Sequence, residues 1–168
     1  MGLPKLNLMV ESPETNTKSE ESGRDLMIEV RGVSKRFGSR VGVENLSFDV
    51  GVGEVTGFLG PNGSGKTTTM RLITSYYTPD SGYIRVAGDD TQEFEIETRR
   101  RIGYLPENNP LYADMLVHEY LDFVADVRGL NGTERRNNLD RAISVTGVGD
   151  VYRLPIGQCS KGYRQRIG

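Results

Sequence analysis

One octapeptide restricts the fold of this chain more than any other feature of its 168 residues. Residues 60–67, GPNGSGKT, satisfy the pattern G-x-x-x-x-G-K-[ST]. The preceding run 55–59, VTGFL, is nearly continuous apolar sequence, which is typical of a strand covered on both faces. The following residues, Lys66 to about Tyr76, favour a helix that stops before Pro79. A loop of this composition between a strand and a helix predicts a phosphate-binding site; the alternative is a glycine-rich turn with an incidental Lys-Thr pair.

The residue types in this loop suit phosphate chemistry. Three glycines let the backbone adopt conformations closed to other residues, so that successive N–H groups point at phosphate oxygens. The helix start adds the positive end of its dipole. We expect the Lys66 ammonium to reach the β- and γ-phosphates as a catalytic group, and the Thr67 hydroxyl to bind Mg²⁺. The nucleotide-binding residues predicted in the loop are Gly60, Pro61, Asn62, Gly63, Ser64, Gly65, Lys66, Thr67 and Thr68.

The rest of the sequence predicts an α/β domain behind a polar tail. Residues 11–25 consist almost entirely of Ser, Thr, Glu, Asn, Pro and other charged residues, and we expect residues 1–25 to form a disordered tail, with a docking peptide at Leu6–Val10 as the alternative. Residues 26–168 carry strand and helix patterns instead. Apolar spacing predicts strands around 28–30, 46–50 and 84–86, a buried strand at 102–105, and helices over 93–100, 117–124 and 139–143.

Charge and hydropathy exclude several classes. Lys and Arg number 21 against 23 Asp and Glu, a net charge of −2, so electrostatics gives no reason to expect a nucleic-acid partner. No stretch approaches the roughly 18 apolar residues of a membrane-spanning helix. Cys159, the one cysteine, is expected to be a packed apolar residue rather than a reactive thiol.

Together with the phosphate loop, three further segments resemble the nucleotide-binding subunit of an ABC transporter over residues 26–168. The first is KRFG at 35–38, in which Phe37 precedes Gly60 by 23 residues, where the family places its adenine-stacking aromatic. Phe37 is therefore the candidate for base contact, and a core residue at a strand end is the alternative. The resemblance implies a P-loop NTPase fold of ABC type, with a small antiparallel β subdomain, a RecA-like parallel sheet with flanking helices, and a helical insertion.

The second segment, IGYLPENN at 102–109, resembles the Q-loop of the family, but Glu107 stands where Gln is usual. The resemblance implies a catalytic and Mg²⁺-binding role for this position. A carboxylate there is expected to bind Mg²⁺ more strongly and to add negative charge near the γ-phosphate, slowing hydrolysis or changing its pH dependence. The alternative is a turn glutamate in solvent.

The third segment, CSKGYRQR at 159–166, resembles a variant of the LSGGQ signature. Ser160 is expected to cap a helix whose N-terminus meets a γ-phosphate. In the family this occurs across a head-to-tail dimer. The form of this segment and of LPENNPLY resembles ATPases of the gliding-motility and multidrug-export group. The signature residues carried over are Ser160, Lys161, Gly162 and Tyr163.

The resemblance implies an ATPase with ATP and Mg²⁺ as ligands. Its implied partners are a membrane-spanning permease subunit and a second nucleotide-binding subunit, and its implied place is cytoplasmic, peripheral on the inner face of the membrane. Two alternatives stay open: a soluble ABC-type ATPase without transport, and a truncated nucleotide binder without turnover. A GTPase is disfavoured because no N-K-x-D motif follows the loop.

The sequence ends at Gly168, inside the signature helix. The resemblance implies that a Walker B strand with an Asp and a catalytic Glu, and then a switch histidine, would follow; His118 does not stand at that position. We therefore expect a fragment that holds the binding half of the site, exposes unpaired strand edges and is prone to aggregate.

Overall fold

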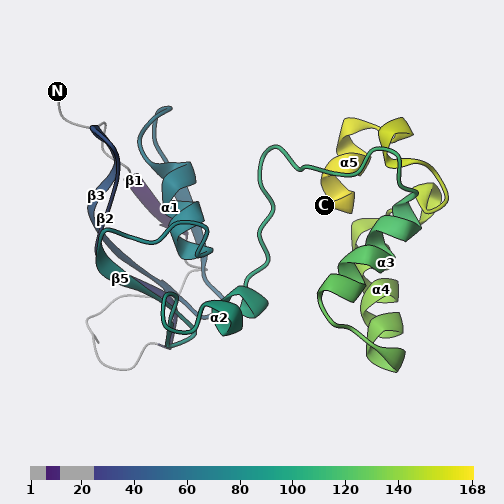
Figure 1. Ribbon diagram of the computed structural model, residues 1–168, viewed down its shortest axis with the longest axis horizontal. Helices are drawn as coiled ribbons and strands as arrows, with labels where there is room; N and C mark the ends of the chain where they lie inside the picture. The colour runs from purple at the N-terminus through teal and green to yellow at the C-terminus, as the bar shows by residue number, and fades with distance from the viewer. Residues whose placement is uncertain (1–6, 12–24) are drawn as a thin grey trace. The chain divides into compact units, whose positions relative to one another are not determined.

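The computed structural model describes residues 7–11 and 25–168, and the described chain divides into two compact units. The first, here called the phosphate-loop unit, ends at Tyr104, and the second, the helical unit, spans Leu105–Gly168 (Figure 1). No helix within the described ranges is both long and apolar enough to cross a bilayer. Of the tail predicted over residues 1–25, residues 7–11 form a strand, and residues 1–6 and 12–24 lie outside the described residues.

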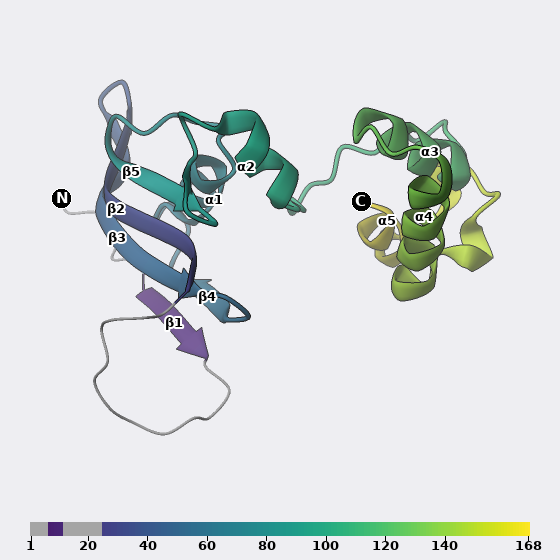
Figure 2. The same ribbon diagram turned by 90° about the horizontal axis from the view of Figure 1, so that it is seen from below.

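A four-stranded antiparallel sheet forms the larger part of the phosphate-loop unit. Its strand order is β3-β2-β5-β6, and β2 pairs antiparallel with both β3 and β5 (Figure 2). Alternation buries one face of the sheet against α1, which confirms the strands predicted from the period-two pattern. The strands are β2 (Leu26–Phe37), β3 (Arg40–Gly51), β5 (Ser81–Val86) and β6 (Asp89–Asp90); the buried core is Val30, Val33, Val43, Leu72, Ile73, Ile84 and Val86.

A second, two-stranded sheet leads into the phosphate loop. β4 (Val55–Leu59) pairs antiparallel with β1 (Asn7–Glu11), with Asn7 opposite Leu59 and Glu11 opposite Val55; Figure 2 shows the two strands side by side. The strand was correctly predicted, but its burial on both faces was wrong, because Val55 is 74% and Leu59 48% exposed. β1 is the ladder partner of β4 among the described residues, and the side chains of β4 alternate between exposed and half-buried. The described residues form no parallel sheet.

Two short helices complete the phosphate-loop unit. α1 (Lys66–Ile73) ends earlier than predicted, because the N–H groups of Tyr76 and Tyr77 both bond to the carbonyl of Arg71 and turn the chain. α2 (Glu95–Arg101) follows the predicted helix closely. The buried strand predicted at 102–105 does not form: these residues have no ladder partner among those described, and Tyr104 and Leu105 are largely exposed. An apolar run becomes a strand only where a neighbour completes its hydrogen bonds.

The helical unit packs three α-helices and two 3₁₀ turns around its own core. The apolar face predicted over 117–124 is confirmed, because Val117, Tyr120 and Leu121 lie in or against the core. The face predicted over 139–143 is confirmed only at Ile143, because α4 has no buried residue and Ala142 is exposed. Gly147 ends α4 in the left-handed conformation (φ +61°). Arg135 of α4 ties it to α3, bonding Asp122 at 2.8 Å and pairing with Asp126. The elements are α3 (Val117–Val127), α4 (Gly132–Thr146), η1 (Gly149–Val151), η2 (Ile156–Gln158) and α5 (Lys161–Ile167); the core is Val117, Val148, Val151, Ile156, Cys159 and Ile167.

Candidate functional site

The phosphate loop connects β4 to α1 through residues 60–65. Residues 60–63 are exposed, whereas Ser64 is buried and its Oγ has no hydrogen-bond partner among the described residues. Gly63 and Gly65 have φ angles of +85° and +100°, in the left-handed region where only glycine is unstrained. The loop therefore has the backbone form that the motif predicts, and it holds a buried hydroxyl with spare hydrogen-bonding capacity.

The start of α1 presents free donors to the loop. Its first helical bond runs from Thr69 N to Gly65 O at 2.8 Å, and Thr69 Oγ1 donates to the same carbonyl at 3.0 Å. The preceding N–H groups of Lys66, Thr67 and Thr68 have no backbone acceptor within residues 25–168. Free donors at the positive end of a helix dipole attract an anion. These groups, with the Ser64 hydroxyl, fit a bound phosphate.

The Lys66 side chain lies across its own loop. Its Nζ donates to the carbonyl oxygens of Gly60 at 2.5 Å and Pro61 at 3.0 Å. The ammonium is thus held at the loop by weak neutral acceptors, which a phosphate oxygen would outcompete because charge-assisted hydrogen bonds are stronger. The Thr67 side chain at the same helix end is exposed, so its hydroxyl is accessible to a cation.

Phe37 stands at the end of β2, next to β3, whose Gly42 contacts Gly65 of the phosphate loop. Its ring packs edge-on against Tyr77, with centroids 5.0 Å apart, and it lies close over Gly42, where a Cβ would be 2.8 Å from Phe37 Cε2. The residue remains 40% exposed and is not part of the buried core. This position favours the hypothesis that Phe37 is available for contact with a base over the alternative that it is a core residue.

The other predicted site residues belong to the helical unit. Glu107 is exposed in the irregular segment before α3. Ser160 caps α5 as predicted, its Oγ accepting from Tyr163 N at 3.2 Å. Lys161 and Gly162 are exposed in the first turn. The described chain thus groups Phe37 with the phosphate loop in one unit, and Glu107 with the signature segment in the other.

Two residues outside the loop lie apart from the candidate site, and the expectation for one of them, Cys159, is confirmed. Cys159 is buried in the helical core, with Sγ 3.6 Å from Pro155 O, as a packed apolar residue. His118 is half-buried on α3, with its ring 5.4 Å from that of Tyr152. Neither contributes to the candidate site.

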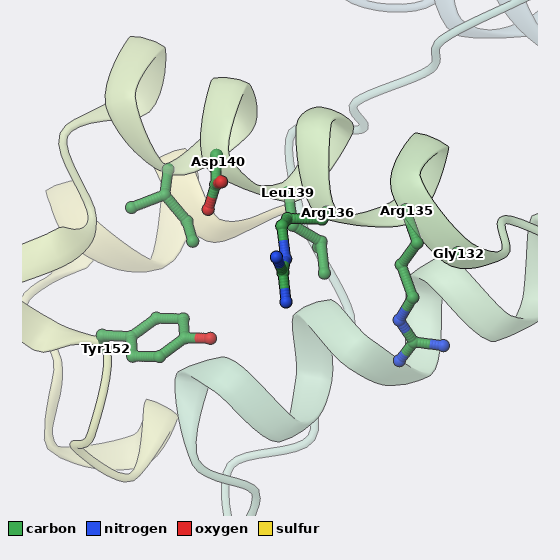
Figure 3. Close-up of a pocket in the computed structure, with 7 residues that line it drawn as sticks. Gly132, Arg135, Arg136, Leu139, Asp140 and Tyr152 are labelled. Carbon is green, nitrogen blue, oxygen red and sulfur yellow. The ribbon is translucent and has the colours of Figure 1, made fainter.

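A pocket of about 340 Å³ lies on α4. Figure 3 shows Arg135 and Tyr152 at opposite ends of the lining, with Arg136 between them on α4. None of the predicted site residues lines this pocket. It is therefore a surface feature of the helical unit and no part of the phosphate-binding site.

Three residues that support the site were missed by the sequence analysis: Gly42, Arg71 and Tyr77. Gly42 carries no local signal, because its contacts with Phe37 and Gly65 depend on how β3 packs. Arg71 holds Tyr77 through a hydrogen bond of 3.1 Å. The adjacent pair of tyrosines at 76–77, after the helix and before Pro79, was the one available hint.

With this geometry established, comparison with known proteins is informative. The sequence profile of the ABC transporter family matches residues 43–168. The probable multidrug ABC transporter ATP-binding protein YbhF of Escherichia coli K12 is 34% identical over 146 residues, covering 86% of this chain and 25% of its own length. The bacitracin transport ATP-binding protein BcrA of Bacillus licheniformis is 32% identical over 142 residues, covering 84% and 45%.

A solved structure has the same fold. That of cbiO1 from Clostridium perfringens, described as part of the ABC transporter complex cbiONQ, has a TM-score of 0.70 at 20% identity and covers 85% of this chain and 59% of its own. The chain spans between a quarter and about half of the length of the curated relatives described above. The matched profile includes the phosphate loop and the signature segment.

Proposed function

Because the chain belongs to the ABC transporter family, we propose that it is the ATP-binding subunit of a transporter, in which binding and hydrolysis of MgATP drive a membrane-spanning permease subunit. The observation that carries this proposal is the phosphate loop, in which a positive-φ glycine backbone ends at the free donors of α1. This arrangement supports binding of a nucleoside triphosphate by its phosphates.

Binding follows from the groups at the loop. The phosphates lie on the N–H groups of Lys66, Thr67 and Thr68, and the Lys66 ammonium leaves the loop carbonyls to contact the β- and γ-phosphates. Thr67 would supply a hydroxyl ligand for Mg²⁺, and the bound ion would neutralise charge on the phosphate oxygens. Phe37 stacks on the adenine, which needs only an accessible aromatic face.

Hydrolysis requires groups from the helical unit and a second subunit. We propose that Glu107 lies near the γ-phosphate, where its carboxylate would contact the Mg²⁺ ion and the attacking water. Ser160, Lys161, Gly162 and Tyr163 act at the phosphate loop of the partner subunit in a head-to-tail dimer. The first turn of α5 supports this role, because Ser160 caps it and Lys161 is exposed in it as a positive charge.

The transporter is proposed to be an exporter. Support comes from the names of relatives, one a probable multidrug transporter protein and another a Nod factor export protein of Burkholderia orbicola, 32% identical over 140 residues. The permease subunit would dock on the helical unit, at the segment that contains Glu107. The ATP-binding subunit would then be peripheral on the inner face of the membrane.

Nucleotide titration tests the proposal. The whole chain is titrated with a fluorescent ATP analogue in the presence of Mg²⁺, and phosphate release is assayed in parallel. Lys66→Ala is expected to weaken binding about ten- to a hundredfold, since a charge-assisted hydrogen bond contributes roughly 1.5–3 kcal/mol. The control Arg128→Ala removes an exposed cation of the helical unit and leaves binding unchanged. Saturable binding without phosphate release favours a nucleotide binder without turnover; no binding contradicts the proposal.

The role of Glu107 needs a separate experiment. Glu107→Gln in the whole chain is expected to alter the Mg²⁺ dependence and the rate of phosphate release. An unchanged Mg²⁺ dependence and an unchanged rate contradict the assignment of Glu107 to the metal.

A further inference from the structure

An aromatic cluster lies at the end of the phosphate-loop unit that carries Phe37. Phe37 and Tyr77 meet edge-on at 5.0 Å between centroids with an interplanar angle of 66°. Tyr77 in turn meets Tyr76 at 5.1 Å and 70°. Phe37 closes the β2–β3 hairpin and Tyr77 follows α1, so two separate elements beside the phosphate loop bring these rings together. Edge-to-face pairs are favourable and directional, because the positive ring edge meets the negative face.

Arg71 fixes the second ring of this cluster. Its Nη1 donates to Tyr77 Oη at 3.1 Å, and its guanidinium carbon lies 5.4 Å and 5.7 Å from the ring centroids of Tyr76 and Tyr77. The Arg71 carbonyl also accepts from the N–H groups of both tyrosines, at 2.8 Å and 3.1 Å. The hydrogen bond with Tyr77 raises the pKa of the Arg71 guanidinium above its ordinary value. Side chain and backbone of one α1 residue thus determine where Tyr77 lies.

Phe37 is restrained on two sides and still accessible. Gly42 approaches it so closely that a Cβ there would be 2.8 Å from Cε2, and the Tyr77 ring packs edge-on against it with centroids 5.0 Å apart. Even so, 40% of the residue is exposed. A restrained aromatic side chain loses less conformational entropy on binding a planar ligand than a free one, so its orientation adds to affinity. The Phe37 ring is therefore held in one orientation by its neighbours and is still accessible to a ligand.

We propose that Tyr77, held by Arg71, is a positioning residue that orients Phe37 for stacking on the base of the bound nucleotide. This inference rests on the proposed function, because it presumes a nucleotide in the phosphate loop. It separates the site into two parts with different chemistry: the loop recognises phosphates, and the Phe37–Tyr77–Arg71 cluster recognises the base. A ligand with phosphates and no base is bound by the first part alone.

Calorimetric titration of the whole chain with ATP and with inorganic tripolyphosphate, each with Mg²⁺, tests this separation. Tyr77→Leu is expected to weaken ATP binding about three- to tenfold, the range for losing an aromatic pair, and to leave tripolyphosphate binding unchanged. Tyr77→Phe keeps the ring and is expected to retain most of the ATP affinity. The matched control is Tyr112→Leu, which removes an exposed tyrosine ring of the helical unit, outside this cluster, and is expected to leave the affinity for both ligands unchanged.

A double-mutant cycle shows whether Tyr77 acts through Phe37. In a Phe37→Ala background, Tyr77→Leu is expected to cause no further loss of ATP affinity. A further loss in that background, an equal loss for ATP and tripolyphosphate, or an unchanged ATP affinity in Tyr77→Leu would each overturn the inference. Failure of the proposed function looks different: the unmodified chain would bind neither ATP nor tripolyphosphate, and the inference would fall with it.

Discussion

Gly65 lies directly against the carbonyl of Gly42, so closely that a Cβ at position 65 would be 2.7 Å from Gly42 O and 3.2 Å from Val43 Cγ2. Gly65 is the residue before α1, with φ +100°. The last glycine of the phosphate loop is therefore fixed twice, by its backbone conformation and by contact with β3. Gly42 of β3 therefore contacts both the phosphate loop, at Gly65, and the ring of Phe37.

Two glycine substitutions separate these two constraints. Gly63→Ala adds a Cβ at φ +85° with nothing within 4 Å, so it is expected to cost only the backbone strain, about 1–2 kcal/mol of unfolding free energy. Gly65→Ala adds the same strain and must displace the Gly42 carbonyl, so we expect a loss of roughly 2–4 kcal/mol. Urea unfolding followed by circular dichroism measures both. Equal losses for the two variants would show that the contact with Gly42 has no energetic effect.

The parts of the site predicted correctly are those encoded by neighbouring residues. The phosphate loop between strand and helix and the Ser160 cap each depend on a few consecutive residues, and both are present. The residues that were missed depend on packing between elements: Tyr77 reaches Phe37 across 40 positions of sequence. No local period encodes such a contact.

The errors concern strands for the same reason. A strand is stable only with a ladder partner, and the local sequence of a strand does not determine which segment pairs with it. The apolar run at 102–105 therefore read as a strand although no described partner pairs with it. Conversely, residues 7–11 read as tail, yet they pair with β4 over five positions. The apolar residues at 8–10 stand beside a long polar stretch, and nothing in that local sequence names β4 as their partner.

Asp80 links the turn before β5 to the end of β2, and its effect on stability should depend on pH. Its carboxylate accepts from Lys35 Nζ and from Arg36 N, both at 2.7 Å. The hydrogen bond from Lys35, with that from Arg36, holds the pKa of Asp80 below its ordinary value of 3.8. A carboxyl whose pKa is lowered on folding stabilises the fold above its unfolded pKa, and this contribution is lost as pH falls through the folded pKa.

We therefore expect Asp80→Asn to lower the melting temperature at pH 7 and to have a progressively smaller effect below about pH 3.8. The measurement is a series of thermal melts from pH 7 to pH 2.5. Asp114→Asn, which changes an exposed carboxylate of the helical unit, is the control and should alter the melting temperature little at pH 7. A pH-independent difference between Asp80→Asn and the unmodified chain would contradict the charge-based account.

The Ser160 cap predicts a measurable loss in the helical unit. Ser160→Ala removes the acceptor for Tyr163 N and is expected to cost about 1 kcal/mol, with a range of roughly 0.5–2 kcal/mol. Ser144→Ala is the matched control, because Ser144 is exposed within α4, where alanine favours the helix. Urea unfolding should separate the two variants in opposite directions. Equal stability of both would mean that the α5 start does not depend on its cap.

The pairing of β1 with β4 predicts that residues 7–11 protect the strand that supports the phosphate loop. Deleting residues 1–11 removes β1, and deleting residues 1–6 leaves it in place, so the two deletions differ only in the strand. Hydrogen exchange read by mass spectrometry is expected to accelerate about tenfold or more over residues 55–59 in the longer deletion only, since unpaired strand amides open more readily. Equal exchange over these residues in both deletions would contradict the pairing, because the hydrogen bonds of the ladder are what slow it.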